Sequence, residues 1–543
     1  MPPSARRRSP LRLLVAAVAV LTLPALALLP APRPAAAAGD PLRVYVLVTD
    51  GLEPQEVTTA KMPRLAQLKA EGVWYEQASA VMVAETTPNH VAMATGMLPE
   101  NNGIVGNSAF DPDDPDRGDA YQDDPRLLTA DTTVTRLERD CEQEISTATI
   151  QSKTYLFNIF REGGSQKAAD FHWNAEPFYI PESEHALDQL TMDQLRRWVF
   201  VEQPPTPQFA FVNLGDIDRS GHIDPTGNAV DGEYPAGRSG AMLDTDALIG
   251  TFVDGLKAQG WWDDTVLIVA SDHGMDYSLP DAYVDFPAAF AGAGLSVGFD
   301  LANDDVGISE NGGAALVYVH DVAKRDEVRA VLDNLDGVDL VLSRDAPPHL
   351  ADYGLDHPRA GDFVALVEPG RRVASGNFGS SNPIPGNHGH AITQHSVLMV
   401  TGGHDAVAEP SSVAGLVDRG AGSVHRAESG PGNLSIAPTV NALFGLAPPA
   451  GGYDGQPLTD AFTSLDSQLC VAAGGGGGGG GEGPGGGGPG GGGGGDGGDG
   501  TDVADRDGGG PSVPVLPATG GGLAGAGLVV LAAGLLVAAL RRR

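Results

Sequence analysis

The sequence VYVLVTDG, residues 44–51, is an apolar run that ends directly in Asp50. Three other apolar runs border Asp or His in the same way: 209–214 before Asp216, Asp218 and His222, 266–270 before Asp272 and His273, and 397–400 after His388. Such runs alternate with helical segments, which predicts an α/β fold whose mostly parallel central sheet carries helices on both faces. Ligands of such sheets bind at the carboxyl ends of the strands, so we expect a metal site at one sheet edge.

A short helix is predicted over Pro88–Thr95, with Pro88 at its first position and Gly96 as its end. Thr86 and Thr87 precede it, and either residue can serve simply as a helix cap. A threonine hydroxyl beside a metal can also act as a nucleophile, because the metal activates it. Free backbone N–H groups at a helix N-terminus suit a phosphate group.

Several motifs occur in a fixed order along the chain: DG at 50–51, TTPNH at 86–90, ATGMLP at 94–99, NGIVGNS at 102–108, DRSGH at 218–222, DHG at 272–274 and HG at 388–389. Together they resemble the nucleotide pyrophosphatase/phosphodiesterase branch of the alkaline phosphatase superfamily. The resemblance covers residues 42–404, which is most of the predicted folded region.

The resemblance implies two divalent metal ions at the sheet edge, and we expect zinc, which binds imidazole and carboxylate. The implied ligand sets are Asp218, His222 and His388 for one ion, and Asp50, Thr86, Asp272 and His273 for the other. Thr86 would attack the phosphoryl group to give a phospho-threonine, which water then hydrolyses. Asn107 would donate to a phosphoryl oxygen, and a pair of metals can stabilise both the entering and the leaving oxygen.

Some neighbouring residues compete for these roles. Asp216 competes with Asp218, and His390 and His395 compete with His388, but the family spacing favours the residues named above. Phe110 stands where the family has an aromatic residue, and its ring is expected either to stack on substrate or to pack in the core.

The expected reaction is hydrolysis of a phosphodiester or phosphoanhydride bond in a small phosphorylated substrate. A phosphomonoesterase or phosphonate hydrolase of the same superfamily is the alternative, and a monoesterase would use Arg or Lys to bind the extra negative charge. Lys69 and Arg117 are the basic residues nearest to Thr86 on either side, which favours a diester unless a basic residue folds in from elsewhere. A non-catalytic cell-surface binding protein would be expected to lose ligands, whereas all seven expected positions are present.

The net charge and the cysteine content bear on the binding partners and the location of the protein. The net charge of −36 argues against a nucleic-acid-binding surface. The two cysteines, Cys141 and Cys470, are expected either to form a disulfide, which an extracellular location permits, or to remain as buried thiols.

Both ends of the chain carry targeting patterns. Residues 1–38 have a basic start, an apolar stretch and a run of alanines, which predicts a secretory signal peptide. Residues 516–543 begin with LPATG and continue into an apolar stretch and three arginines, resembling a Gram-positive cell-wall sorting signal with a transmembrane segment. This resemblance implies cleavage between Thr519 and Gly520 by a sortase-type transpeptidase, and attachment to peptidoglycan.

The expected organisation is therefore a signal peptide at 1–38, a phosphodiesterase domain at 40–470, a disordered Gly-rich linker at 471–515 and the sorting signal at 516–543. Within the domain, insertions or cap segments are expected near 111–144 and 277–382. The protein would be secreted and then anchored to the cell wall.

Overall fold

The computed structural model describes residues 42–178, 186–204, 208–223, 237–277, 282–374, 386–415, 430–467 and 469–470. The predicted signal peptide, the linker at 471–515 and the sorting signal with Thr519 and Gly520 lie outside these residues. Among the residues described, no helix has the length and apolar character that a membrane span requires.

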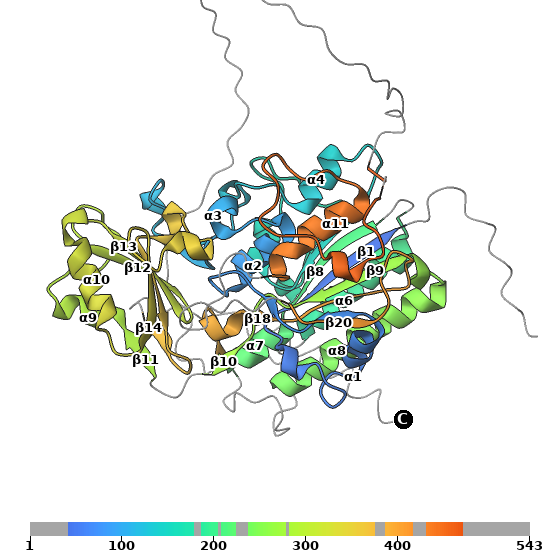
Figure 1. The fold of residues 1–543 in the computed structure, drawn as a ribbon, viewed down its shortest axis with the longest axis horizontal. Coiled ribbons are helices and arrows are strands. Elements are labelled where there is room, and N and C mark those ends of the chain that lie inside the picture. Colours follow the sequence, from blue (N-terminus) through green and yellow to red (C-terminus); the bar gives the residue numbers. More distant parts are fainter. Residues whose placement is uncertain are drawn as a thin grey trace, which may run out of the picture. The chain divides into compact units, whose positions relative to one another are not determined.

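A central sheet of eight strands organises the described residues (Figure 1). From one edge to the other its strands are β20 (Ser411–Val413), β2 (Val73–Tyr75), β19 (Leu398–Thr401), β9 (Thr265–Ala270), β1 (Arg43–Thr49), β8 (Gln208–Leu214), β6 (Ser146–Gln151) and β7 (Phe171–Asn174). The five strands from β9 to β7 run parallel, and β19 is antiparallel to both of its neighbours. The predicted mostly parallel sheet is thereby confirmed.

Alternating residues of β1 enter two hydrophobic cores, one on each face of the sheet. Val44, Val46 and Val48 pack with residues from α2 (Thr86–Thr95), α4 (Thr133–Asp140), α5 (Thr154–Ile159) and α11 (Ile436–Phe444). Tyr45 and Leu47 pack with residues from α1 (Pro63–Glu71), α6 (Ala186–Arg196) and α8 (Arg238–Gln259). Helices therefore cover both faces, as predicted for an α/β fold.

A second sheet lies within the segment expected as the insertion 277–382. Its four antiparallel strands, in order, are β12 (Val306–Asn311), β13 (Ala314–Val319), β15 (Phe363–Val367) and β14 (Val338–Ser343). We call residues 282–374, which contain this sheet together with α9 (Phe286–Gly292) and α10 (Arg325–Asp333), the cap.

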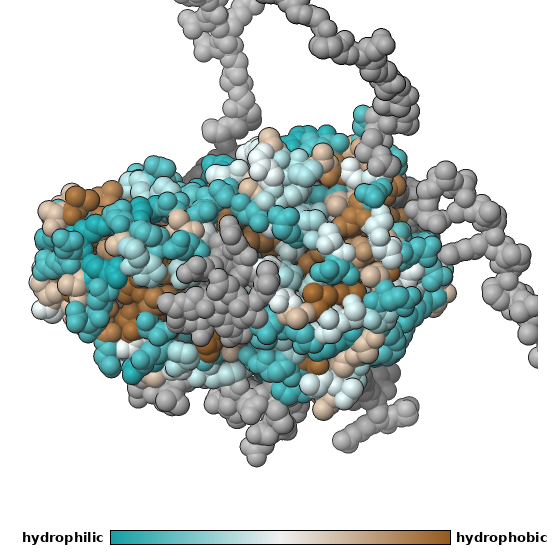
Figure 2. Space-filling view, in the orientation of Figure 1, coloured by the Kyte–Doolittle hydropathy of each residue, from teal (hydrophilic) through white to brown (hydrophobic). Residues whose placement is uncertain are grey.

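On the face shown in Figure 2, hydrophilic residues predominate and apolar residues form small patches.

The cap sheet also has two packed faces. Ala315 and Val317 of β13 pack with α9 and α10 residues, whereas Leu316 and Tyr318 pack with Phe110 and its neighbours from the first third of the chain. The second face therefore joins the cap to the segment that follows Thr86.

The remaining described α-helices and strands are short. They are α3 (Pro99–Asn102), α7 (Asp216–Ile223) and the two-stranded pairs β3 (Ala78–Ser79) with β18 (His395–Ser396), β4 (Ser108–Phe110) with β5 (Asp119–Tyr121), β10 (Asp276–Tyr277) with β17 (Gly386–Asn387), and β11 (Tyr283–Asp285) with β16 (Arg372–Ala374). The polar segment 111–144, where an insertion was expected, contains β5 and α4.

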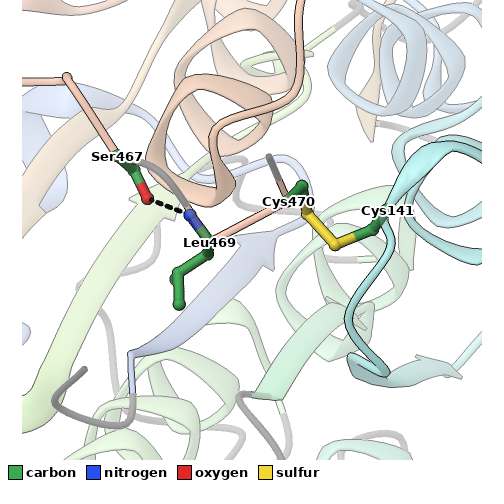
Figure 3. Close-up of a disulfide and its surroundings, with 4 residues drawn as sticks. All are labelled: Cys141, Ser467, Leu469 and Cys470. Carbon is green, nitrogen blue, oxygen red and sulfur yellow. Dashed lines mark hydrogen bonds between the residues drawn. A yellow bond between two sulfur atoms is a disulfide. The ribbon is translucent and has the colours of Figure 1, made fainter. Parts of the chain in front are cut away.

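Cys141 and Cys470 form a disulfide across a sequence separation of 329 residues (Figure 3). Cys141 follows α4, and Cys470 is the last described residue. The bridge therefore ties the end of the described chain to its first third, which decides between the two states expected for these cysteines.

Candidate metal centre

Strand pairing brings the four predicted junctions to one edge of the central sheet. The strands β8, β1 and β9 are parallel neighbours, so their carboxyl ends lie together. β19 runs antiparallel to β9, with Leu398 opposite Ala270. A residue ahead of β19 therefore reaches the same edge as residues that follow the parallel strands, and His388 can meet Asp50 there.

Asp218, His222 and His388 form one group of candidate metal ligands. The Nε2 atoms of His222 and His388 lie 3.3 Å and 3.6 Å from Asp218 Oδ1. One ligand atom from each of the three residues lies within 4.8 Å of the others. The Nδ1 atom of His222 lies 2.8 Å from the Gly386 carbonyl oxygen, a contact that orients Nε2 toward the group.

His273 is the centre of the other group. Its Nε2 atom lies 3.2 Å from Thr86 Oγ1, 3.4 Å from Asp272 Oδ2 and 3.6 Å from Asp50 Oδ1. The rings of His273 and His388 stack with their centroids 3.8 Å apart, so the two groups are adjacent. All of the ligands predicted from the sequence are thus brought together.

The buried carboxylate oxygens of these groups suit divalent cations. Asp50 Oδ1, Asp218 Oδ1 and Asp272 Oδ2 accept no hydrogen bond from any described residue. Their nearest partners are imidazole nitrogens at 3.3–3.6 Å, which satisfy a buried carboxylate oxygen poorly, and a cation would satisfy it better. Oxygen and imidazole donors are also the ligands that zinc accepts. The residues therefore fit the expected metal centre.

Gly51 allows the close approach of two ligand-bearing segments. Its φ of 72° is a left-handed conformation, and a Cβ atom at this position would lie 3.1 Å from the Cβ of Asp218. Glycine here lets the turn after β1 pass beside the start of α7.

Thr86 is the first residue of α2, so the helix begins two residues before the predicted start at Pro88. Proline is tolerated throughout the first helical turn, where its missing N–H has no intrahelical partner. The Asn89 side chain fixes this turn, since Oδ1 accepts from Val81 N at 2.7 Å and Nδ2 donates to the Glu85 carbonyl at 2.9 Å. The Thr86 hydroxyl is consequently held at a helix N-terminus beside His273.

Comparison with known proteins assigns this arrangement to a family. The profile of the type I phosphodiesterase / nucleotide pyrophosphatase family matches residues 44–391.

The chain belongs to this family. Human bis(5'-adenosyl)-triphosphatase ENPP4 is 24% identical over 253 residues, which are 45% of this chain and 50% of that protein. Mouse ectonucleotide pyrophosphatase/phosphodiesterase family member 3 is 22% identical over 249 residues, which are 44% of this chain and 25% of that protein. The chain thus spans about half the length, or less, of these curated relatives.

Solved structures of this family share the fold. Murine ectonucleotide pyrophosphatase/phosphodiesterase 5 superposes with a TM-score of 0.57 at 18% identity, over 78% of this chain and 100% of that one. The human protein of the same name gives a TM-score of 0.57 at 17% identity, with the same coverage. An inactive variant of the murine protein has been solved in complex with AMP.

Glu85 is a further buried residue of the centre in this family member. Its carboxylate accepts a hydrogen bond from Asn107 Nδ2, and its Oε1 lies 3.2 Å from His388 Nδ1. Asn107 Oδ1 accepts from the backbone N–H of Thr87 at 2.7 Å. Burial raises the pKa of Glu85 to about 7. Its position directly before Thr86 was the signal in the sequence that could have found it.

Lys153 is the residue that the sequence patterns missed most plainly. It follows β6, and its Nζ lies 2.7 Å from Asp218 Oδ2, 2.9 Å from Asp50 Oδ2 and 3.3 Å from Thr86 Oγ1. A basic residue thus does fold in beside Thr86, so the sequence argument for a diester loses its basis. Burial by itself would lower the pKa of Lys153, but Asp218 and Asp50 raise it well above the usual value.

The histidines of the centre respond differently to their surroundings. Burial, and then the neighbouring His273, lower the pKa of His388 well below its usual value. Burial alone would also lower the pKa of His222, but the adjacent Asp218 carboxylate raises it. A neutral imidazole is the form that binds a metal, so His388 is already in the ligand state at neutral pH.

Phe110 lies in the core between the cap and the segment after Thr86. The residue is 1% exposed, and its ring stacks on Phe299 at 5.0 Å and meets Tyr318 edge-on at 5.4 Å. This arrangement favours the core-packing alternative over contact with substrate.

The rival ligands have other partners. Asp216 Oδ2 accepts from the Asp188 backbone N–H at 2.9 Å, His390 Nε2 lies 2.6 Å from the Arg371 carbonyl, and His395 Nε2 lies 3.1 Å from the Glu76 carbonyl. These contacts agree with their exclusion from the predicted ligand sets.

Proposed function

We propose that this family member is an extracellular hydrolase of phosphodiester or phosphoanhydride bonds that acts through a phospho-threonine at Thr86. The observation that carries the proposal is the position of the Thr86 hydroxyl. It lies 3.2 Å from His273 Nε2 at the buried N-terminus of α2, beside both groups of candidate ligands. A nucleophile, an anion-binding helix end and a cation site therefore coincide.

The side chains divide the work in this proposal. Two divalent cations, zinc by expectation, would be held by Asp218, His222 and His388 and by Asp50, Thr86, Asp272 and His273, and would neutralise charge on the reacting oxygens. The N-terminus of α2 orients the phosphoryl group in line with Thr86 Oγ1. Asn107 Nδ2 has a second hydrogen besides the one given to Glu85, and this hydrogen is available for a phosphoryl oxygen.

The location is likewise a proposal. A disulfide between Cys141 and Cys470 suits an oxidising compartment, which agrees with the signal-peptide pattern at 1–38. We extend the proposal to covalent attachment of the protein to peptidoglycan by a sortase-type transpeptidase acting between Thr519 and Gly520.

The decisive test is hydrolysis of bis(p-nitrophenyl) phosphate by the purified protein with zinc. We expect turnover by the wild type and a loss of at least about 1,000-fold in Thr86→Ala, since removing the nucleophile removes the covalent route. Attack by Thr86 releases one p-nitrophenolate, so mass spectrometry of the acid-quenched wild type should place an adduct that retains the phosphorus and the second p-nitrophenyl group on the peptide that contains Thr86.

Thr87→Ala is the matched control, because Thr87 is equally buried in the same helical turn. It should retain turnover within about tenfold. Turnover by Thr86→Ala equal to that of the wild type would refute the nucleophile. A zinc-loaded wild type that hydrolyses no phosphate ester would instead indicate a non-catalytic binding protein on the same fold.

A further inference from the structure

Glu85 places a buried carboxylate directly before the proposed nucleophile. It occupies the N-cap position of α2, and its side chain is 4% exposed. Cap side chains commonly accept from their own helix, but Glu85 Oε2 accepts from Asn107 Nδ2, and its Oε1 lies 3.2 Å from His388 Nδ1. The carboxylate is therefore directed at the site, and none of the roles proposed above uses it.

Backbone segments enclose the Oε1 side of this carboxylate. Gly312, in the turn between β12 and β13 of the cap, has a φ of 62°, and Gly389 has a φ of 89°. A Cβ atom at either glycine would lie only 3.0 Å or 3.1 Å from Glu85 Oε1. The backbone N–H of Gly389 also donates to the Ala84 carbonyl at 2.9 Å. The carboxylate thus has little room to turn away from Asn107.

The contact with Glu85 determines which end of the Asn107 amide faces the site. Asn107 Oδ1 accepts from the backbone N–H of Thr87 at 2.7 Å, while Nδ2 donates to Glu85. Turning the amide over would place Oδ1 against the carboxylate and Nδ2 against the Thr87 N–H, so both contacts would become repulsive. The observed orientation leaves one Nδ2 hydrogen for a phosphoryl oxygen, whereas the reversed orientation would oppose that oxygen with Oδ1.

We propose that Glu85 is a positioning residue that holds the Asn107 amide with Nδ2 toward the phosphoryl oxygen during attack by Thr86. A donor that is already oriented stabilises developing charge without any reorganisation during the reaction. The role needs an acceptor rather than a negative charge, because the oxygen of a neutral carboxyl or amide group also accepts from an N–H. The inference rests on the proposed function and adds the residue on which the action of Asn107 depends.

The test is a double-mutant cycle in the zinc-loaded full-length protein, with bis(p-nitrophenyl) phosphate as the substrate. Glu85→Met removes the acceptor at similar side-chain length and should lower kcat/KM by about 10- to 100-fold. Asn107→Ala should cost about 100-fold, as expected for one lost donor to developing charge. Because Glu85 acts through Asn107, Glu85→Met should cost less than about twofold more in the Asn107→Ala protein, whereas a structural role would cost the same in both backgrounds.

Glu85→Gln separates the two contacts of the carboxylate. Its amide oxygen can still accept from Asn107 Nδ2, but its other end presents N–H groups to His388 Nδ1. We expect turnover within about fivefold of the wild type per bound zinc, with the zinc content of every variant measured by atomic emission. Inorganic phosphate should bind at least about fivefold more weakly to Glu85→Met than to the wild type, and Glu85→Gln should restore most of this binding.

Glu138→Met is the matched control. Glu138 Oε1 accepts from Thr147 Oγ1 at 2.8 Å, so this change also removes an acceptor from a side-chain donor. Thr147 lies near the amino end of β6, at the sheet edge opposite the metal centre. The variant should leave turnover and phosphate inhibition unchanged.

Three results would overturn the inference. They are losses that multiply fully in the Glu85→Met, Asn107→Ala double variant, a loss of more than about tenfold per bound zinc in Glu85→Gln, and a loss in Glu85→Met that disappears when the rate is expressed per bound zinc, which would place the effect at His388. The Glu85→Gln result decides by itself if Glu85→Met does not fold. Failure of the proposed function looks different, because Thr86→Ala would then retain wild-type turnover whatever the Glu85 variants show.

Discussion

The central sheet and the cap sheet are both buried on two faces, yet they carry different chemistry. In the parallel sheet, neighbouring strands end at the same edge, and residues after β1, β8 and β9 gather there as Asp50, Asp218, Asp272 and His273. In the antiparallel cap sheet, successive strands end at opposite edges. Strand direction therefore decides which sheet can assemble a cluster from many segments.

The cap nevertheless supports the centre. Its β12–β13 turn contacts the His388 segment, where Gly313 N donates to the His388 carbonyl at 2.7 Å. Asn311 of β12 accepts from the Ser108 backbone N–H at 3.2 Å and donates to the Ser108 carbonyl at 3.0 Å. The cap thus supports the backbone around the centre, whereas the central sheet contributes the charged candidate ligands.

The largest expected effect on activity would come from removing a carboxylate at the edge of the central sheet. Asp218→Ala removes a candidate metal ligand and a partner of Lys153, so we expect a loss of at least about 1,000-fold in kcat/KM. Bound zinc, measured by atomic emission, should also fall.

Asp339→Ala is the counterpart in the cap, because Asp339 is exposed on β14. It should change neither zinc content nor rate. Comparable losses in the two variants would mean that the contrast between the two sheets is wrong.

A smaller effect is expected at the contact between the two regions. Phe110→Ala should lower the free energy of unfolding by about 3–4 kcal/mol, because it opens a cavity among Phe299 and Tyr318. Urea titration measures this change, and Phe110→Leu should cost less. If instead KM rises in a protein of unchanged stability, the ring contacts substrate and not the core.

The smallest expected effect is the pH dependence of stability that arises from His357 in the cap. Burial, and then the nearby Arg359, lower the pKa of His357 to about 4, whereas the unfolded chain has a value near 6.5. The unfolded state therefore binds the proton first as pH falls, and stability present above about pH 6.5 is lost toward pH 4. Since the residue is partly exposed, we expect a loss of up to about 2 kcal/mol.

Thermal unfolding followed from pH 7 to pH 5 checks this. In His357→Asn, whose amide oxygen can still accept from Arg359 N, the decline should be shallower than in the wild type. Parallel declines in the two proteins would exclude His357 as the source.

The candidate ligands at the edge of the central sheet could be predicted because each one lies next to its own strand in the sequence. An apolar strand followed by Asp or His marks Asp50, Asp218, Asp272 and His273 without any knowledge of pairing. Lys153 was not predicted because the strand before it, β6 (STATIQ), is largely polar in sequence. All residues of this strand except the first are nevertheless buried. The contact of Lys153 with Thr86 spans 67 positions and exists only once β6 pairs beside β8.

The cap shows the converse limit. A change in the pattern of apolar residues reveals that the cap is an insertion. The sequence does not reveal which face of the cap sheet packs on the rest of the protein, because the residues that meet it lie far away in the chain. Phe110 could not be assigned to substrate or core from its neighbours in sequence, because Phe299 and Tyr318, which enclose it, lie in the cap.

The disulfide has a mechanical consequence. Tension applied to the chain beyond Cys470 passes through the sulfur bridge to Cys141 as well as along the backbone. The bridge fastens the C-terminal side of residues 430–467 next to α4, so this segment cannot separate from α4 while the disulfide is intact. This segment includes α11, which packs against α2. A pull on the tail would therefore reach α4 first, and α4 itself contacts the helix that presents Thr86, because the Thr133 hydroxyl donates to the Ala94 carbonyl at 3.1 Å.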